Sequence, residues 1–210
     1  MRVSDDLQIS LQPEPEPESE TDLAAVPSTP EQDGLVVLLS TVPERAVDLA
    51  AGVDGERLQY RHGPAFPTLQ ELIDHLAEAG TRVDALFRHA YLDHQRELNV
   101  REAVDPPFQA SSGRPAGEAL EGFARDRRRT IDMLRGLTEA DWNRPLQDPR
   151  EGEVTLLGIA RLVATHELAH LAQLRNLIAV LPESQDLGPV GGGPQPLPGA
   201  AGSGSGEEDA

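Results

Sequence analysis

Two histidines on one helical segment carry the clearest chemical signal in this sequence. His166 and His170 stand four positions apart in VATHELAHLAQL, residues 163–174. Residues at this spacing share a helix face with Cβ atoms roughly 6 Å apart, so two imidazoles can converge on one cation. The apolar stripe that contains Ile159 and Leu177 runs through both histidines. This pattern predicts that both rings face the core.

The same letters match the HExxH pattern of zinc peptidases, in which the glutamate is the general base. An extended peptidase motif would place glycine at 173 and histidine at 176, where this chain has Gln173 and Asn176. A later glutamate ligand would have to be Glu183 or another tail residue. No stretch has the alternation of a strand that could line a peptide cleft. A peptidase is therefore disfavoured, and Glu167, turned by about 100° from its neighbour, is expected to flank the ring pair.

A cation held by two imidazoles needs a third ligand, since buried rings are costly without partners. His75 is the best candidate, because it flanks the apolar pair Leu72 and Leu76 about two turns into another predicted helix. The alternative is a hydrogen-bonded histidine cluster without metal, because a single core-facing histidine is usually structural. Three further histidines lie in loop or polar settings and are expected to be solvated: His62, His89 and His94.

Helical periodicity in the middle of the chain predicts an all-α fold, an up-and-down four-helix bundle. Thr41 and Glu44 match a capping box, so Pro43 either kinks the first helix or stands just inside a restart. Thr68 and Glu71 form a second capping box at the start of the next helix. The expected helices cover about 34–52, 68–99, 116–136 and 155–182.

The two ends of the chain differ in composition from this middle part. Residues 1–33 contain QPEPEPESETD, and residues 182–210 are rich in glycine and proline. Neither end has a periodic apolar face, so both are predicted to be disordered around one domain at 34–181. Of the formal charge of −18, the two ends carry −8 and −5 and the domain −5.

Charge and composition exclude several functions. The domain lacks the concentrated basic face that nucleic-acid binding needs, and the run 127–129, three arginines, is expected to be a solvated helix face. The absence of cysteine excludes disulfides, thiolate ligands and a cysteine nucleophile. No signal peptide and no apolar stretch of about 20 residues is present, so no membrane association and a cytoplasmic location are expected.

Three segments resemble the DinB-like superfamily, specifically its DinB_2 type. They are PTLQELIDHLAEAGTRV (67–83), LRGLTEADWNRP (134–145) and GEVTLLGIARLVATHELAHLAQLR (152–175), within a resemblance that covers about 150 of the 210 residues. The chain departs from the family at Phe66, where many members have tryptophan. The resemblance implies a metal-binding four-helix bundle.

The resemblance also implies a site and a chemistry. It implies that His75, His166 and His170 are the ligands of a divalent metal, and imidazole suits zinc, nickel and iron alike. Similar proteins include thiol S-transferases and isomerases that use low-molecular-weight thiols such as bacillithiol or mycothiol, and many others have no assigned activity. A metal-dependent small-molecule transferase is therefore the leading expectation, and the resemblance is also compatible with a homodimer. A non-catalytic metal-binding or stress-related bundle is the alternative.

Overall fold

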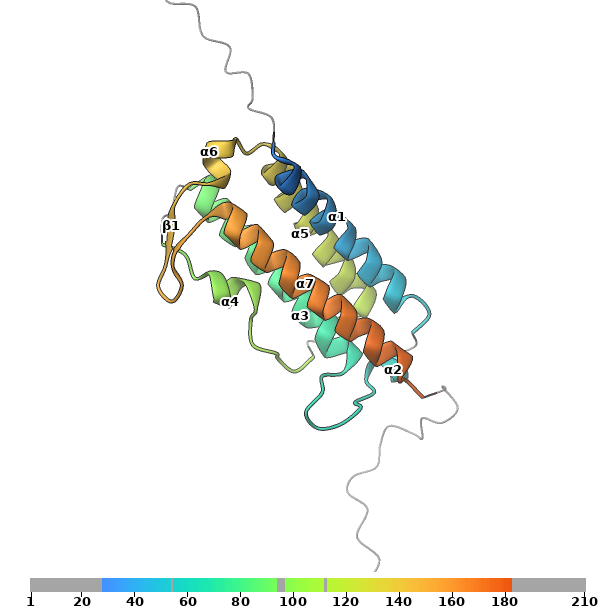
Figure 1. The fold of residues 1–210 in the computed structure, drawn as a ribbon. Helices are drawn as coiled ribbons and strands as arrows, with labels where there is room; N and C mark the ends of the chain where they lie inside the picture. The colour runs from blue at the N-terminus through green and yellow to red at the C-terminus, as the bar shows by residue number, and fades with distance from the viewer. Residues whose placement is uncertain (1–27, 54, 94–96, 112, 183–210) are drawn as a thin grey trace, which may run out of the picture.

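The computed structural model describes residues 28–53, 55–93, 97–111 and 113–182. Most of the two ends predicted to be disordered, 1–33 and 182–210, lies outside these residues, and so does His94. Residues 30–33 form the first turn of α1, so the prediction of disorder is wrong there. In the described part, four long helices form a bundle (Figure 1). They are α1 (Pro30–Ala50), α3 (Leu69–Tyr91), α5 (Ala116–Arg135) and α7 (Leu156–Ala179). The shorter elements are α2 (Gly55–Leu58), α4 (Val100–Val104), α6 (Glu139–Trp142), β1 (Leu146–Asp148) and β2 (Gly152–Val154).

Helix α1 starts earlier than predicted and is continuous. Thr29 accepts a hydrogen bond from the backbone N–H of Gln32, whose side chain accepts one from the N–H of Thr29, so a capping box starts the helix. Of the two alternatives predicted at Pro43, a kink or a restart, the restart is wrong, because the helix continues through Pro43. The Thr41 hydroxyl donates to the Leu38 carbonyl and therefore does not cap a new helix.

The second capping box is confirmed, but the helix that it starts is shorter than predicted. Thr68 and Glu71 exchange hydrogen bonds as the motif requires. Helix α3 then ends at Tyr91 and not near Asn99. The following segment is drawn away from the helix axis by tertiary hydrogen bonds, such as the one from the Val100 N–H to the Asp148 carboxylate at 2.7 Å.

A small hairpin precedes α7. No strands were predicted from the sequence, and this hairpin was therefore missed. Strands β1 and β2 pair antiparallel, with Leu146 opposite Val154 and Asp148 opposite Gly152. The Asp148 carboxylate also accepts hydrogen bonds from two backbone N–H groups of the turn, and Gly152 has a φ of 79° that favours glycine. Strands of three residues are too short to show the alternation by which strands are recognised.

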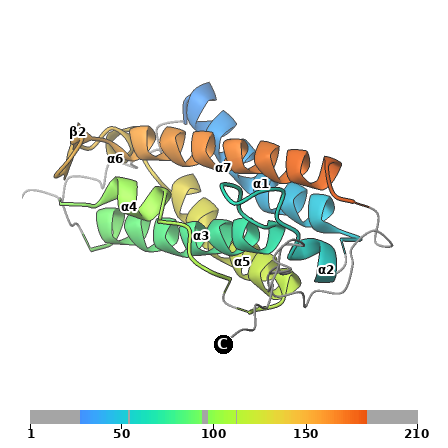
Figure 2. The ribbon, with the colours of Figure 1, turned by 90° about the horizontal axis from the view of Figure 1, so that it is seen from below.

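The predicted all-α four-helix bundle is confirmed, but the simple up-and-down order is not, because two consecutive long helices run in the same direction. Helix α1 packs against α5 and α7, and α3 packs against the same two helices. Consecutive helices alternate in direction except α3 and α5, which are parallel: contacts from Thr81 to Asp126 and from Asp84 to Arg129 advance together along both. A long crossover from 92 to 115, which includes α4, makes this possible (Figures 1 and 2).

The core has two apolar clusters separated by a polar level. One cluster contains Phe87 and Trp142 at the end of the bundle near α6, and the other contains Leu72 and Phe123 at the opposite end. Polar side chains from α3, α5 and α7 lie between them. None of the helices in the described residues is long and apolar enough to cross a bilayer.

Candidate metal centre

Three histidines meet at one point between α3 and α7. The Nε2 atom of His75 lies 3.2 Å from that of His166 and 3.1 Å from that of His170, and the last two are 3.0 Å apart. His75 is buried, and the other two are partly buried. The predicted convergence of rings from two helices is therefore present, so these are the candidate ligands.

The donor set fits a divalent cation. Two nitrogens bound 2.0–2.1 Å from one metal at a tetrahedral angle lie about 3.3 Å apart, close to the distances among these three atoms. Three neutral imidazoles that point their Nε2 atoms at one another cannot all be satisfied by mutual hydrogen bonds, because each nitrogen is either a donor or an acceptor. A cation would satisfy three lone pairs at once. The cluster therefore suggests a divalent metal.

Burial keeps the three rings in the form that binds metal. Burial lowers the pKa of His75 to about 4, and the neighbouring His170 adds to the shift. For the same reasons, the pKa of His166 is lowered to about 4. Burial also lowers the pKa of His170. All three rings are therefore neutral at pH 7 and can offer lone pairs.

Gln173 orients one of the rings. Nδ1 of His170 donates a hydrogen bond to Oε1 of Gln173 over 3.0 Å. This bond assigns the proton to Nδ1 and leaves the Nε2 lone pair directed at the cluster. In the sequence, Gln173 was noted as a mismatch with a peptidase motif and was assigned no role at the site. Its i, i+3 spacing from His170 was a signal that could have identified it.

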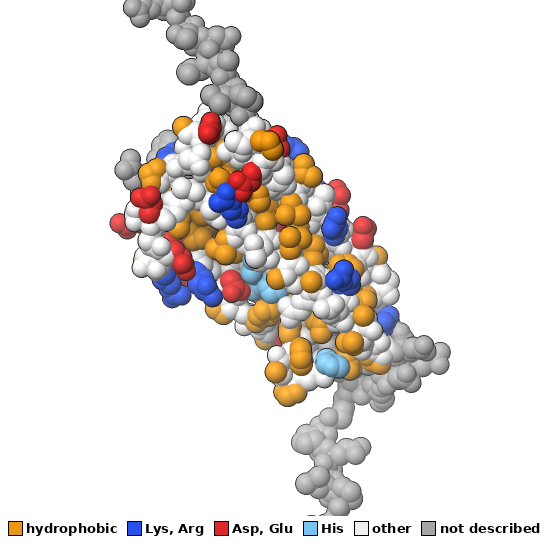
Figure 3. Space-filling model, viewed as in Figure 1, with side chains coloured by type: hydrophobic (Ala, Val, Ile, Leu, Met, Phe, Trp, Pro, Cys, Tyr) orange, Lys and Arg blue, Asp and Glu red, His pale blue; other side chains and the backbone are white. Residues whose placement is uncertain are grey.

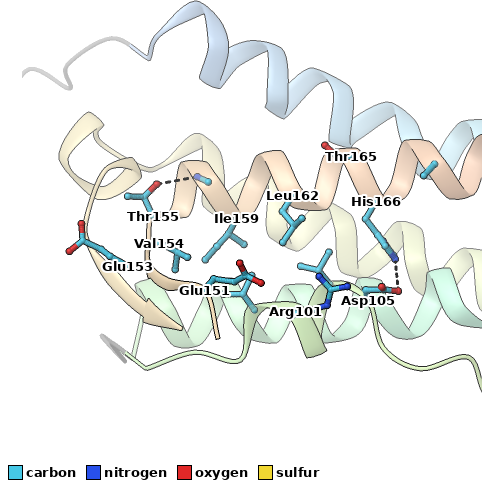
Figure 4. Close-up of a pocket in the computed structure, with 14 residues that line it drawn as sticks. Arg101, Asp105, Glu151, Glu153, Val154, Thr155, Ile159, Leu162, Thr165 and His166 are labelled. Carbon is cyan, nitrogen blue, oxygen red and sulfur yellow. Dashed lines mark hydrogen bonds and ion pairs between the residues drawn. The ribbon is translucent and has the colours of Figure 1, made fainter. Parts of the chain in front are cut away.

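The crossover adds a carboxylate and an aromatic ring that sequence reasoning missed. Oδ1 of Asp105 lies 3.4 Å from Nε2 of His166 and 3.8 Å from Nε2 of His75 (Figure 4). The ring of Phe108 stacks on that of His75, with centroids 4.2 Å apart and planes inclined by 6°. The sequence spacing between these residues and the histidines does not predict the contact. Asp105 and Phe108 belong to the crossover, which packs against the bundle and is not one of its four long helices.

Glu167 is withdrawn from this centre, contrary to the peptidase pattern. It forms a buried ion pair with Arg127 of α5, and both side chains are only 1% exposed. The expectation of a solvated arginine run is therefore wrong at Arg127, and burial lowers the pKa of this guanidinium to about 10. A carboxylate engaged in this way cannot serve as the general base beside the histidines.

The other described histidines lie away from the cluster. His62 is exposed and makes an edge contact with Phe66, with ring centroids 5.5 Å apart. His89 is exposed, and its Nδ1 lies 2.7 Å from Oδ2 of Asp93. The expectation that both are solvated is confirmed.

A cavity of about 600 Å³ opens beside the cluster. It lies between α4, the hairpin and α7, and His166 and Asp105 stand at one end of it (Figure 4). In Figure 3, histidine atoms reach the surface near the middle of this face and border hydrophobic and charged side chains. A small molecule in the cavity would therefore lie next to the candidate ligands.

Fold and site together define a four-helix bundle with a histidine-rich candidate metal centre. The chain belongs to the DinB superfamily, whose family model matches residues 38–174. A solved structure with a similar fold is YfiT from Bacillus subtilis, described as "a probable metal-dependent hydrolase with an unusual four-helix bundle topology". The two share 18% sequence identity and a TM-score of 0.57, over 79% of this chain and 94% of that one. No curated protein matches the chain.

Proposed function

We propose that this protein is a divalent-metal-dependent enzyme that transfers a group of a small molecule to a low-molecular-weight thiol. The observation that carries this proposal is the meeting of three Nε2 atoms within 3.0–3.2 Å at the end of an open cavity. Three protein ligands leave coordination positions open, which is typical of catalytic rather than structural sites.

His75, His166 and His170 would hold the metal, with Gln173 fixing the orientation of His170. Asp105 also offers an oxygen within 4.8 Å of these three nitrogens. We leave it outside the ligand set because its Oδ1 lies 3.4 Å from Nε2 of His166 and 3.8 Å from Nε2 of His75, farther than the three nitrogens lie from one another. A divalent cation supplies a Lewis acid that makes a thiol or water more acidic and polarises a substrate. Asp105 has a side chain that is 51% exposed and lies against the cavity. We assign it the role of accepting the nucleophile's proton at Oδ1, because the imidazoles are engaged as ligands and Glu167 is paired with Arg127.

Hydrolysis is the second candidate, with water in place of the thiol. It is favoured by the description of the similar YfiT structure as a probable metal-dependent hydrolase. The same residues would serve either reaction, since both need an activated nucleophile beside a bound small molecule. The dependence of turnover on added thiol separates the two.

The test begins with the full chain and its metal content, measured by native mass spectrometry and elemental analysis. Consumption of small thiols in the presence of an electrophile panel is then followed for the wild type, His170→Ala and Asp105→Asn. We expect His170→Ala to lose both metal and activity, and Asp105→Asn to retain metal while kcat falls by at least about a hundredfold, within the range for loss of a proton-transfer group. His89→Ala, an exposed histidine, is the matched control.

Two results would reject the proposal. Turnover that persists in metal-free protein would exclude a metal-dependent reaction. Stoichiometric metal without turnover of thiol or water would instead support the non-catalytic alternative, in which the metal stabilises the bundle.

A further inference from the structure

The cavity beside the metal centre has aliphatic walls. Val104 of α4, Val154 of the hairpin, and Ile159 and Leu162 of α7 line it. Among the described residues that line it, none is Phe, Tyr or Trp, so the imidazole of His166 is the one ring there on which a flat aromatic ligand could stack. These walls suit the flexible hydrocarbon part of a small molecule.

One basic side chain lies close to the metal centre in this cavity. Arg101 and Asp105 stand one helical turn apart at the end of α4, where the Asp105 N–H donates to the Arg101 carbonyl over 2.9 Å, and both line the cavity. Figure 4 shows Arg101 between Asp105 and Glu151. Arg101 has no ion-pair partner among the described residues, so its guanidinium donors are available to a ligand.

One of the three acidic residues of the cavity, Asp105, lies beside the histidines, and the other two lie on the hairpin. Glu151 and Glu153 belong to the hairpin, and Figure 4 shows Glu153 at its outer end. A bound divalent cation would add positive charge next to Asp105, on the same side as Arg101. The histidine end of the cavity would then favour an anionic group, while the hairpin end would repel a second one.

We infer that the substrate bound in this cavity is an aliphatic monocarboxylate, whose carboxylate pairs with Arg101 and whose hydrocarbon chain lies against the valine, isoleucine and leucine walls. This inference rests on the proposed function for the role of the ligand as substrate, but the binding site itself does not require metal. The carboxylate beside Arg101 would hold the neighbouring carbon atoms near His166 and Asp105, where the reaction would take place.

The test uses octanoate, octylamine and octanol as probes of one chain length and three charges. Their binding to the full chain is measured by titration calorimetry, in metal-loaded and in chelator-treated protein. We expect octanoate to bind at least about tenfold more tightly than octylamine in metal-loaded protein, as one charge-assisted hydrogen-bonded pair can provide. In chelator-treated protein the charge of Asp105 is not offset by a cation, so octanoate should bind more weakly but still depend on Arg101. Arg101→Ala should weaken octanoate about tenfold and leave octanol unchanged.

Matched variants separate the cavity from general effects. Arg128→Ala removes an exposed arginine of α5 and should change nothing. Leu162→Trp fills the cavity and should weaken octanoate and octanol alike, whereas Leu168→Trp, on the same helix but outside the cavity, should not. The two leucines are 43% and 38% exposed, so both replacements should be tolerated by the fold.

The inference would be overturned if octanoate did not bind at millimolar concentration or if Arg101→Ala left its binding unchanged. It would also be overturned if octanoate bound metal-loaded protein no more strongly than octylamine does. Failure of the proposed function looks different. If the protein holds no metal but still binds octanoate through Arg101, the proposed function is refuted and the carboxylate-binding site is supported. If the protein is an active metalloenzyme but binds no octanoate, the proposed function is supported and the monocarboxylate inference is refuted.

Discussion

The Nε2 atom of His75 on α3 lies 3.1 Å from the Nε2 atom of His170 on α7. The two rings meet nearly edge to face, with planes inclined by 69°. His75 is covered by the stacked ring of Phe108, and His170 is held by Gln173. Both rings are thus oriented before any cation arrives, which lowers the entropic cost of binding one.

Replacing His75 with alanine should abolish stoichiometric metal binding. Loss of one of three ligands should weaken binding by more than the roughly 10–100-fold that follows loss of a ligand's hydrogen-bond partner. Elemental analysis after gel filtration gives the metal content, and His62→Ala serves as an exposed control. Wild-type metal content in the His75 variant would contradict the assignment.

Gln173→Ala should reduce metal affinity by about 10–100-fold without abolishing binding. The reason is the loss of the acceptor that holds the proton on Nδ1 of His170 and aims Nε2 at the cluster. Competition with a chromogenic chelator measures the affinity. Asn176→Ala, an exposed change one turn further along α7, should leave affinity as it is. If Gln173→Ala bound the metal as tightly as Asn176→Ala does, Gln173 would not orient the His170 ligand.

Breaking the buried ion pair should be costly, and replacing both partners much less so. Arg127→Met leaves the Glu167 carboxylate buried without its partner, which should lower the free energy of unfolding by about 3–5 kcal/mol. The double variant Arg127→Met with Glu167→Leu should recover most of that loss and retain metal. Urea unfolding measures both. A double variant that folds but cannot bind metal would instead connect Glu167 to the centre.

A surface pair provides the comparison for this experiment. Arg82 and Glu78 form an i, i+4 ion pair with partly exposed side chains. Arg82→Ala removes this pair together with the 3.6 Å contact of Arg82 to Glu102, and it should change the free energy of unfolding by less than about 1 kcal/mol. The contrast with Arg127 arises because water compensates the exposed Glu78 carboxylate but not the buried Glu167 carboxylate.

Gly80→Ala should destabilise the bundle by about 1–3 kcal/mol. A Cβ at this position would lie 2.5 Å from Cδ2 of Phe123, whose ring is fully buried between α3 and α5 and cannot withdraw. Gly117→Ala, in α5 with nothing within 4 Å of its Cβ position, should instead stabilise the protein by up to about 1 kcal/mol. Thermal unfolding of the two variants checks both signs.

The metal-free protein should lose stability as the pH falls from 7 towards 5. The folded state lowers the pKa of His75 and His166 to about 4, whereas unfolded histidine has a pKa of about 6.5. Between these values the unfolded state binds more protons, so stability rises with pH in this window. Urea unfolding with chelator present measures the slope. His75→Asn should make it shallower, and an unchanged slope would show that His75 does not contribute.

The helices and part of the site follow from local sequence rules. Thr68 and Glu71 mark the start of α3 because their side chains cap the first turn whatever lies around them. The spacing of His166 and His170 places them on one face of α7 for the same local reason. His75 could be chosen as their partner because its position on an apolar stripe is also a local property.

Only the tertiary structure decided the other features. The crossover brings Asp105 and Phe108 to the histidines, and the diagonal contact between α5 and α7 pairs Arg127 with Glu167. The run of three arginines predicted a solvated helix face for Arg127. Its buried partner, Glu167, lies 40 positions away in the sequence, so the neighbours of Arg127 in the chain do not indicate the pair. Local propensity shapes each helix, but long-range packing and the path of the crossover determine which side chains meet.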